Sequence, residues 1–164
     1  WYNNLEKIHS QIHEVISKEA PINKTLLSRR IINAWGISRL GVRLNEYLDK
    51  QYVQMNLKYS IQDENVFYWR EDQDPSKYKI FRLPADDYNK RNAEDLPQQE
   101  VAAGIVHILS QQISLPYDDL IREASRFFGY ARLGSKVDNA IKLGLKYAVK
   151  DGLIVEIDKR YVLN

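Results

Sequence analysis

Two histidines, His9 and His13, are four residues apart, a spacing that places both on one face of a helix where they could bind one metal ion. No glutamate lies between them in the metalloprotease pattern, and the sequence shows no third ligand. His107 is the only other histidine, and the chain has no cysteine to act as a nucleophile or thiolate ligand. We therefore expect two partly exposed histidines rather than a metal centre.

Carboxylates are concentrated in the middle of the chain, but their spacing is not that of a nuclease or glycosidase pair. They are Glu71, Asp72, Asp74, Asp86 and Asp87. A solvated loop explains them more simply. The phosphate-binding pattern G-x-x-x-x-G-K-[ST] is also missing from the sequence. We therefore expect no catalytic residue, no cofactor, no metal and no small-molecule substrate, so that this chain is not an enzyme.

Basic and amide side chains are the better candidates for function, because Arg and Asn can read base edges while Lys mostly contacts phosphate. The net charge is only +2, but residues 1–70 carry +3, residues 71–99 carry −2 and residues 100–164 carry +1. Ten residues are candidates for contact with DNA: Arg39, Arg43, Lys50, Arg132, Lys136, Asn139, Lys142, Lys146, Lys159 and Arg160. The second half is the stronger candidate, because its predicted hairpin tip is basic whereas the first tip, at residues 63–64, is acidic.

A repeated motif organises these residues. Residues 36–44 and 129–137 share the pattern G-x-x-R-L-G-x-[RK]-[LV] at an offset of 93, and apolar character agrees on both sides of it. Arg39 and Arg132 either contact phosphate or brace the turn. For the motif's other residues we favour packing: the leucines, Leu40 and Leu133, would fill the core and the second glycines would allow helices to approach closely.

The elements that position the candidates follow the same repeat. Apolar spacing predicts helices over residues 3–18, 24–35 and 38–54, and again over 98–112, from Pro116 to Gly129, and over 132–150. Asn23 and Ser38 are expected to cap helices, and Gly36 and Gly129 to end them. Each half then closes with a β-hairpin pattern, at residues 58–69 and 153–163.

Three helices followed by a hairpin describe a winged helix-turn-helix. We therefore predict an α+β, mostly helical fold: a tandem duplicated winged helix-turn-helix with a strand-containing connector. The first winged helix spans residues 1–70, the connector 71–97 with one extra strand at 78–82, and the second winged helix 98–164.

The stretches 34–41 and 128–134, with Phe67-Tyr68-Trp69-Arg70, Phe81-Arg82 and Leu96-Pro97-Gln98-Gln99-Glu100 between them, resemble a bacterial domain of unknown function. That domain is found at the C-terminus of large superfamily I helicase-like proteins that also carry a Vsr-like endonuclease domain. The resemblance implies an accessory region and supplies no functional residue. Because the chain begins with Trp1 rather than Met, we expect it to be a piece of a longer protein.

The expected function is non-catalytic: electrostatic contact with DNA, with the parent's other domains as further partners. The alternative is a protein–protein docking platform for the parent's motor or nuclease domains, because helix faces opposite a core are commonly charged simply through solvation. That alternative requires an exposed apolar patch, expected around Trp1, Tyr2, Phe67, Tyr68 and Trp69. No run of about 18 apolar residues occurs, so we expect no membrane partner. The absence of cysteine fits a cytoplasmic location.

Overall fold

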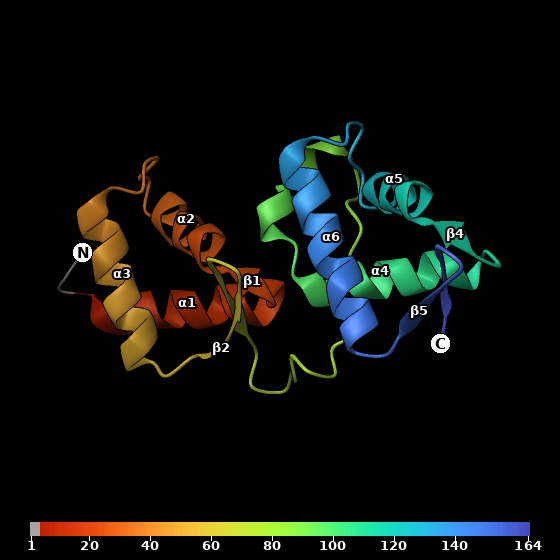
Figure 1. Cartoon of the computed structure of the whole chain (residues 1–164). Coiled ribbons are helices and arrows are strands. Elements are labelled where there is room, and N and C mark those ends of the chain that lie inside the picture. Colours follow the sequence, from red (N-terminus) through yellow and green to blue (C-terminus); the bar gives the residue numbers. More distant parts are fainter. Residues whose placement is uncertain (1–3) are drawn as a thin grey trace. The chain divides into compact units, whose positions relative to one another are not determined.

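The computed structural model describes residues 4–164, and the chain divides into two compact units. Unit 1 runs from Trp1 to Pro75 and unit 2 from Ser76 to Asn164. Within residues 4–164 there are six α-helices and two small antiparallel sheets, so the protein is α+β and rich in helix (Figure 1). Each unit has its own hydrophobic core.

Unit 1 begins with three helices and ends with a sheet (Figure 1). Its elements in chain order are α1 (Leu5–Glu19), β1 (Ile22–Asn23), α2 (Lys24–Ala34), α3 (Val42–Gln54), β2 (Lys58–Gln62) and β3 (Asn65–Trp69). The strand order is β1-β3-β2, so β3 is central and β2 lies at an edge. Asn23 caps α2 as predicted, because its side chain accepts the amide of Thr25 at 2.9 Å.

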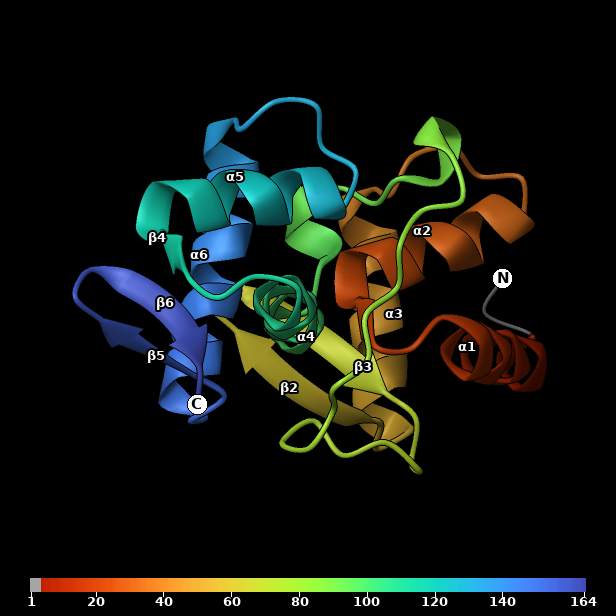
Figure 2. The ribbon, with the colours of Figure 1, turned by 90° about the vertical axis from the view of Figure 1, so that its right-hand side faces the viewer.

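Unit 2 has the same order of helices and strands after a connecting segment with two short 3-10 turns, Asp87–Asn89 and Ala93–Asp95. Its elements are α4 (Gln98–Ser110), β4 (Leu115–Pro116), α5 (Tyr117–Phe127), α6 (Ser135–Lys150), β5 (Ile154–Ile157) and β6 (Arg160–Leu163). The strand order is β4-β6-β5, and Figure 2 shows β5 and β6 as a hairpin beside the end of α6.

The two units keep the 93-residue offset in their backbone. The bounds of α2 and α5 differ by that number, and so do the starts of α3 and α6. Gly36 and Gly129 have φ of 76° and 92°, a region that favours glycine. After Gly36 the amide of Ile37 donates to the carbonyl of Ile32, and the equivalent bond, 93 positions later, ends α5. The predicted helix ends are thereby confirmed.

The predicted starts of the third helices are wrong. The structure begins α3 at Val42 and α6 at Ser135, with Gly41 and Gly134 as their N-caps, so Ser38 is not a cap. Residues 38–40 and 131–133 are instead loop, with a bend at 131–132. Periodicity extends the helix too far because Leu40 still contacts the core from the loop.

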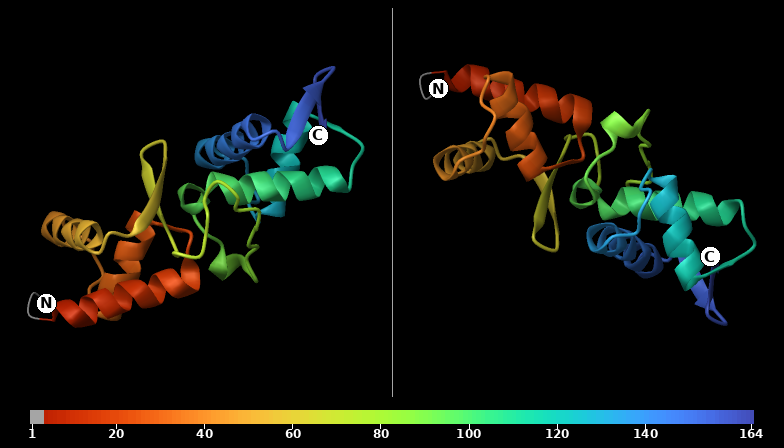
Figure 3. Two further views of the ribbon diagram at one scale, coloured as in Figure 1. Left: turned by 90° about the horizontal axis from the view of Figure 1, so that it is seen from below. Right: turned by 90° about the horizontal axis from the view of Figure 1, so that it is seen from above.

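The core of unit 2 depends on close contact between α4 and α6 (Figure 3). A Cβ on Gly144 would lie 2.1 Å from a methyl carbon of Val101, and one on Gly104 would lie 2.6 Å from the ring of Phe128. Gly144 therefore allows α6 to approach α4, and Gly104 makes room on α4 for the ring of Phe128 at the end of α5. Sequence reasoning assigned that role to Gly41 and Gly134, where an added Cβ would meet nothing within 4 Å, and this assignment is wrong.

The extra strand predicted at residues 78–82 is not formed. Side chains satisfy both backbone groups of Arg82: its amide donates to Glu100 Oε1 at 3.0 Å, and its carbonyl accepts from Arg91 at 2.9 Å. The guanidinium groups of both arginines also lie 2.7 Å from Glu100 Oε2. The segment is thus held to α4 by charge-assisted hydrogen bonds instead of a strand ladder.

Candidate nucleic-acid interface

The three candidates of unit 1 are exposed on α3 and the loop before it. Arg39 lies in the loop, and Arg43 and Lys50 lie on the helix. Arg43 and Lys50 project from α3 because its opposite side supplies Leu48 and Tyr52, both 1% exposed or less, to the core. Within residues 4–164, no ion pair involves any of the three, so their charges are available to a ligand.

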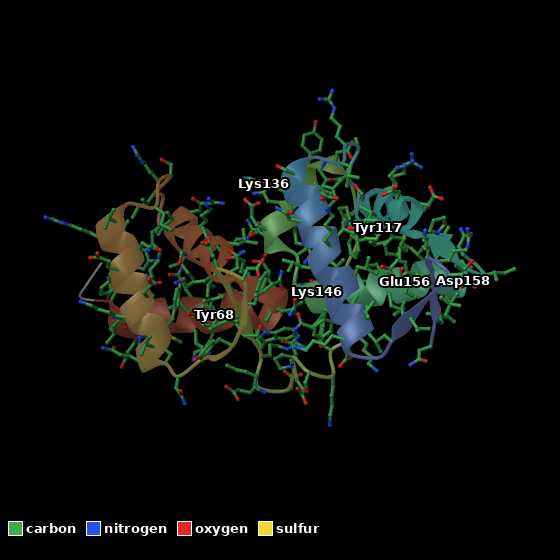
Figure 4. All side chains as sticks on the ribbon, viewed as in Figure 1. Tyr68, Tyr117, Lys136, Lys146, Glu156 and Asp158 are labelled. Atoms are coloured by element: carbon green, nitrogen blue, oxygen red, sulfur yellow. The ribbon has the colours of Figure 1, made fainter. Side chains whose placement is uncertain are left out.

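Five candidates of unit 2 belong to α6 and the loop before it. Arg132 is an exposed loop residue, and the other four are exposed on the helix: Lys136, Asn139, Lys142 and Lys146. Figure 4 labels Lys136 near the start of α6 and Lys146 nearer its end. The opposite face of α6 supplies the core with Ala140, Ile141, Leu145 and Ala148. The last three helix candidates follow i, i+3, i+7 spacing and therefore share one face.

Two of these lysines have acidic neighbours. Lys142 Nζ lies 2.7 Å from Asp138 Oδ2, and the hydrogen bond and charge of Asp138 raise the pKa of Lys142 above its ordinary value. Lys136 Nζ lies 3.4 Å from Glu94 Oε1. Both pairs are largely exposed, so they add little to stability, and their main effect is to offset local positive charge.

The basic hairpin tip of unit 2 has an unusual backbone. Asp158 and Lys159 have φ of 51° and 63°, which side-chain-bearing residues seldom adopt. Lys159 is exposed, whereas the guanidinium of Arg160 is held by Ser114, with Nε 2.6 Å from the hydroxyl. Neither cation of the tip has an ion pair within residues 4–164, although Arg160 is held in place by Ser114. The tip of unit 1 carries exposed Asp63 and Glu64 instead.

Unit 1 also contains a pocket that sequence reasoning missed. It has a volume of about 530 Å³ and lies where the first turns of α2 meet the loop and the start of α3. Its lining includes Thr25, Arg29, Ser38, Arg39, Gly41 and Asn45, and no acidic residue. The repeat held one signal for it: Arg29 is identical to Arg122 at the same offset of 93 as the motif arginines.

The packing interpretation of the repeated motif is only partly right. Leu40 packs against the core of unit 1, but Leu133 is 43% exposed. Arg39 and Arg132 are exposed and have no side-chain partner within residues 4–164, so they do not brace the turn. The motif instead places an arginine before each third helix and a glycine at its N-cap.

The aromatic patch expected for a docking platform is not present at residues 67–69. Phe67, Tyr68 and Trp69 are between 1% and 7% exposed, because β3 is the central strand of its sheet. Tyr68 packs against Tyr52 with ring centroids 5.2 Å apart. Trp1 and Tyr2, the other members of the expected patch, lie outside the described residues.

His9 and His107 contact residues that are not metal ligands of a common site. His9 Nε2 is 2.8 Å from Gln51 Oε1, whereas His107 packs beside Phe81 and Phe127. In the part of the chain that the structure describes, no group of three His, Cys, Asp or Glu residues is arranged to hold a metal ion. Nor does any helix of residues 4–164 have the length and hydropathy to cross a membrane.

Comparison with known proteins gives one match. Residues 2–46 are similar to DUF3320, a family described as a protein of unknown function. This match covers α1, α2 and the start of α3, and it agrees with the predicted resemblance to a domain of unknown function. No curated protein and no solved structure matches the chain.

Proposed function

We propose that each unit is a winged helix-turn-helix. In this assignment α2–α3 and α5–α6 are the helix-turn-helix pairs, and the hairpins β2–β3 and β5–β6 are the wings. The shared element order and the equal 93-residue offset of the helix bounds support it. In such folds the helix after the turn enters the major groove, so α3 and α6 are the proposed recognition helices.

The proposed function is electrostatic contact with DNA through these helices and the basic wing of unit 2. The exposed face of α6 carries the argument. Asn139, Lys142 and Lys146 share that face, while the residues opposite them fill the core. Acidic residues interrupt both basic helices, at Glu46, Asp49 and Asp138. Binding is therefore expected to be weakly sequence-specific and dominated by phosphate contacts.

The resemblance to domains of helicase-like proteins supplies the proposed context. The chain would be a non-catalytic accessory module of a larger cytoplasmic DNA-processing protein, and the parent's ATPase and Vsr-like nuclease domains would perform the chemistry. This module would need no cofactor and no small-molecule substrate. Its partners would be DNA and the other domains of the parent.

A fluorescence anisotropy titration with a labelled duplex and a labelled single strand tests the DNA proposal. The variant Lys142→Glu with Lys146→Glu should bind at least tenfold more weakly than the unchanged chain, about 1.4 kcal/mol. The matched control is Lys77→Glu with Lys79→Glu, which makes the same charge change at two exposed lysines outside the proposed face. Equal affinity for the two variants would overturn the choice of α6.

A specific surface favours protein docking as a second candidate function. Tyr59 and Ile61 alternate along the edge strand β2 and are 61% and 65% exposed. An edge strand with exposed apolar side chains can pair with a strand of another protein. Replacing both with Thr should leave DNA affinity unchanged, and if docking is the function it should weaken association with the parent's other domains in a pull-down of purified proteins.

A further inference from the structure

The pocket of unit 1 is lined by cationic and neutral polar side chains, with a few apolar residues. Of the side chains that line it, Arg29 and Arg39 are cationic, while Thr25, Ser38 and Asn45 are neutral hydrogen-bonding groups. Its lining contains no carboxylate to neutralise the two guanidinium groups. Two positive charges that line one pocket without a counter-charge favour a negatively charged ligand.

Two acidic residues of unit 1 form ion pairs with basic residues outside the pocket lining. Asp49 lies 3.4 Å from Lys24, and Glu19 lies 3.1 Å from Arg30. Within residues 4–164, no ion pair involves Arg29 or Arg39, and both side chains are exposed. The neighbouring lysine and arginine are thus neutralised while the pocket arginines are not. Their planar guanidinium groups can each donate two hydrogen bonds to the oxygens of one phosphate.

The equivalent place in unit 2 has a different charge. At the offset of 93, Arg29 and Arg39 correspond to Arg122 and Arg132, so both units have the two arginines. Thr25 corresponds to Asp118, and Asn45 corresponds to Asp138. Two carboxylates therefore replace two neutral side chains at the equivalent positions, and the summed charge of the four residues falls from +2 in unit 1 to zero in unit 2. The set with two arginines and no carboxylate is that of unit 1.

We infer that the pocket of unit 1 binds one phosphate group, with Arg29 and Arg39 as its charged ligands and Thr25, Ser38 and Asn45 as hydrogen-bonding neighbours. The inference rests on the proposed function in one respect: the phosphate belongs to a nucleic-acid backbone. The sequence favours unit 2 for DNA contact because its hairpin tip is basic. This inference instead gives unit 1 the strongest single phosphate contact. The charge run on α6 then adds a more diffuse attraction.

The test makes unit 1 resemble unit 2. In the variant Thr25→Asp with Asn45→Asp, both arginines remain and the two carboxylates of unit 2 are introduced. The charge-matched control is Ser10→Asp with Ser17→Asp, two exposed positions on α1 of the same unit. Thermal melting of both variants verifies folding. All substituted side chains are on the surface or partly exposed, so both variants should fold.

Two measurements then follow on the full chain. Inorganic phosphate is titrated against ¹⁵N-labelled protein, and a labelled DNA duplex is titrated by anisotropy. We expect saturable amide shifts at residues 38–45 in the unchanged chain and the control, and none in the pocket variant. We expect the pocket variant to bind DNA about tenfold more weakly, with a salt slope shallower by about one.

Each result decides a different claim. Unchanged DNA affinity in the pocket variant, with no phosphate shifts in the unchanged chain, overturns the pocket and leaves the proposed function standing. Phosphate shifts at residues 38–45 without any DNA binding support the phosphate site, show that its phosphate is a free one, and overturn the proposed function. An absence of both responses in the unchanged chain overturns both.

Discussion

Asp138 Oδ2 lies 2.7 Å from Lys142 Nζ, one helical turn away on α6. The pair sits in the middle of the proposed DNA-binding face of unit 2 and offsets the charge of its central lysine. At the equivalent position unit 1 has Asn45, which is neutral. Differences in affinity between the two units should therefore follow their acidic residues as much as their basic ones.

Neutralising this aspartate should strengthen DNA binding. The variant Asp138→Asn releases Lys142 and removes a carboxylate that repels phosphate. We expect an affinity gain of about two- to fivefold at low salt, as measured by anisotropy. Glu6→Gln, which neutralises an exposed acid on α1, is the control and should change affinity little. A loss of affinity in Asp138→Asn would place the DNA elsewhere.

The wing of unit 2 offers a test in which stability and affinity move in opposite directions. Lys159 has φ of 63°, so Lys159→Gly should relieve backbone strain and raise the free energy of unfolding by about 1 kcal/mol. The same change removes one of the two cations of the tip and should weaken DNA binding, with a salt slope smaller by about 0.9. Urea melts and anisotropy measure the two effects. Unaltered DNA affinity would exclude the tip from the interface.

Gly144, at the α4–α6 contact, should tolerate a larger side chain less well than Gly104. A methyl group there would overlap Cβ and Cγ1 of Val101, close to the backbone of α4. Gly144→Ala should therefore destabilise unit 2 by about 1–3 kcal/mol. Gly104→Ala should cost less, because the obstructing atoms belong to the tip of the Phe128 ring, which can tilt. Urea melts of both variants check the order, and the reverse order would contradict this packing.

Glu100 should be the most important charged residue for the stability of unit 2. Its side chain is fully buried between Arg82 and Arg91. Glu100→Gln leaves the two guanidinium groups without a counter-charge, so we expect a loss of about 3 kcal/mol at pH 7. The control, Glu14→Gln, breaks an exposed pair with Lys18 and should change stability little. If both variants lost the same amount of stability, the ion pairs of Glu100 would have to be as accessible to water as the exposed pair of Glu14.

The contribution of Glu100 should also depend on pH. Burial by itself would raise the pKa of this carboxyl, but the two arginines hold the pKa below its ordinary value of 4.5. A carboxyl with a lowered pKa in the folded state stabilises the protein above its ordinary pKa, and this stability is lost as pH falls through the folded value. The difference in unfolding free energy between the unchanged chain and Glu100→Gln should therefore be constant near neutrality and shrink below about pH 4.5. A difference in unfolding free energy that increases as the pH falls below 4.5 would contradict this prediction.

The regular elements could be predicted because their signals are local. The helices of residues 5–19 and 98–110 follow from apolar spacing, and Gly36 and Gly129 end their helices through a conformation that glycine adopts easily. Asn23 could be identified as a cap from its own side chain and the residues that follow it. The repeat then supported the same interpretation twice.

The remaining features depend on contacts between residues far apart in sequence. The segment around Arg82 has strand-like composition, but its backbone partners are Glu100 and Arg91, which pattern does not reveal. The tight glycines are recognisable only from their packing, Gly144 against Val101 of α4 and Gly104 against the ring of Phe128. The pocket likewise brings Arg29 to Arg39 across the turn between two helices. Its charge became informative only by comparison with Asp118 and Asp138 in unit 2.

The salt dependence of DNA binding tests the central claim most directly. Anisotropy of a labelled duplex is measured with the full chain from low to physiological salt, and the logarithm of the affinity is plotted against the logarithm of the salt concentration. Electrostatic contact with several phosphates predicts measurable binding at low salt and a linear plot with a slope of about −0.9 for each phosphate contacted. Absence of binding at low salt, or an affinity that does not change with salt, would contradict the account.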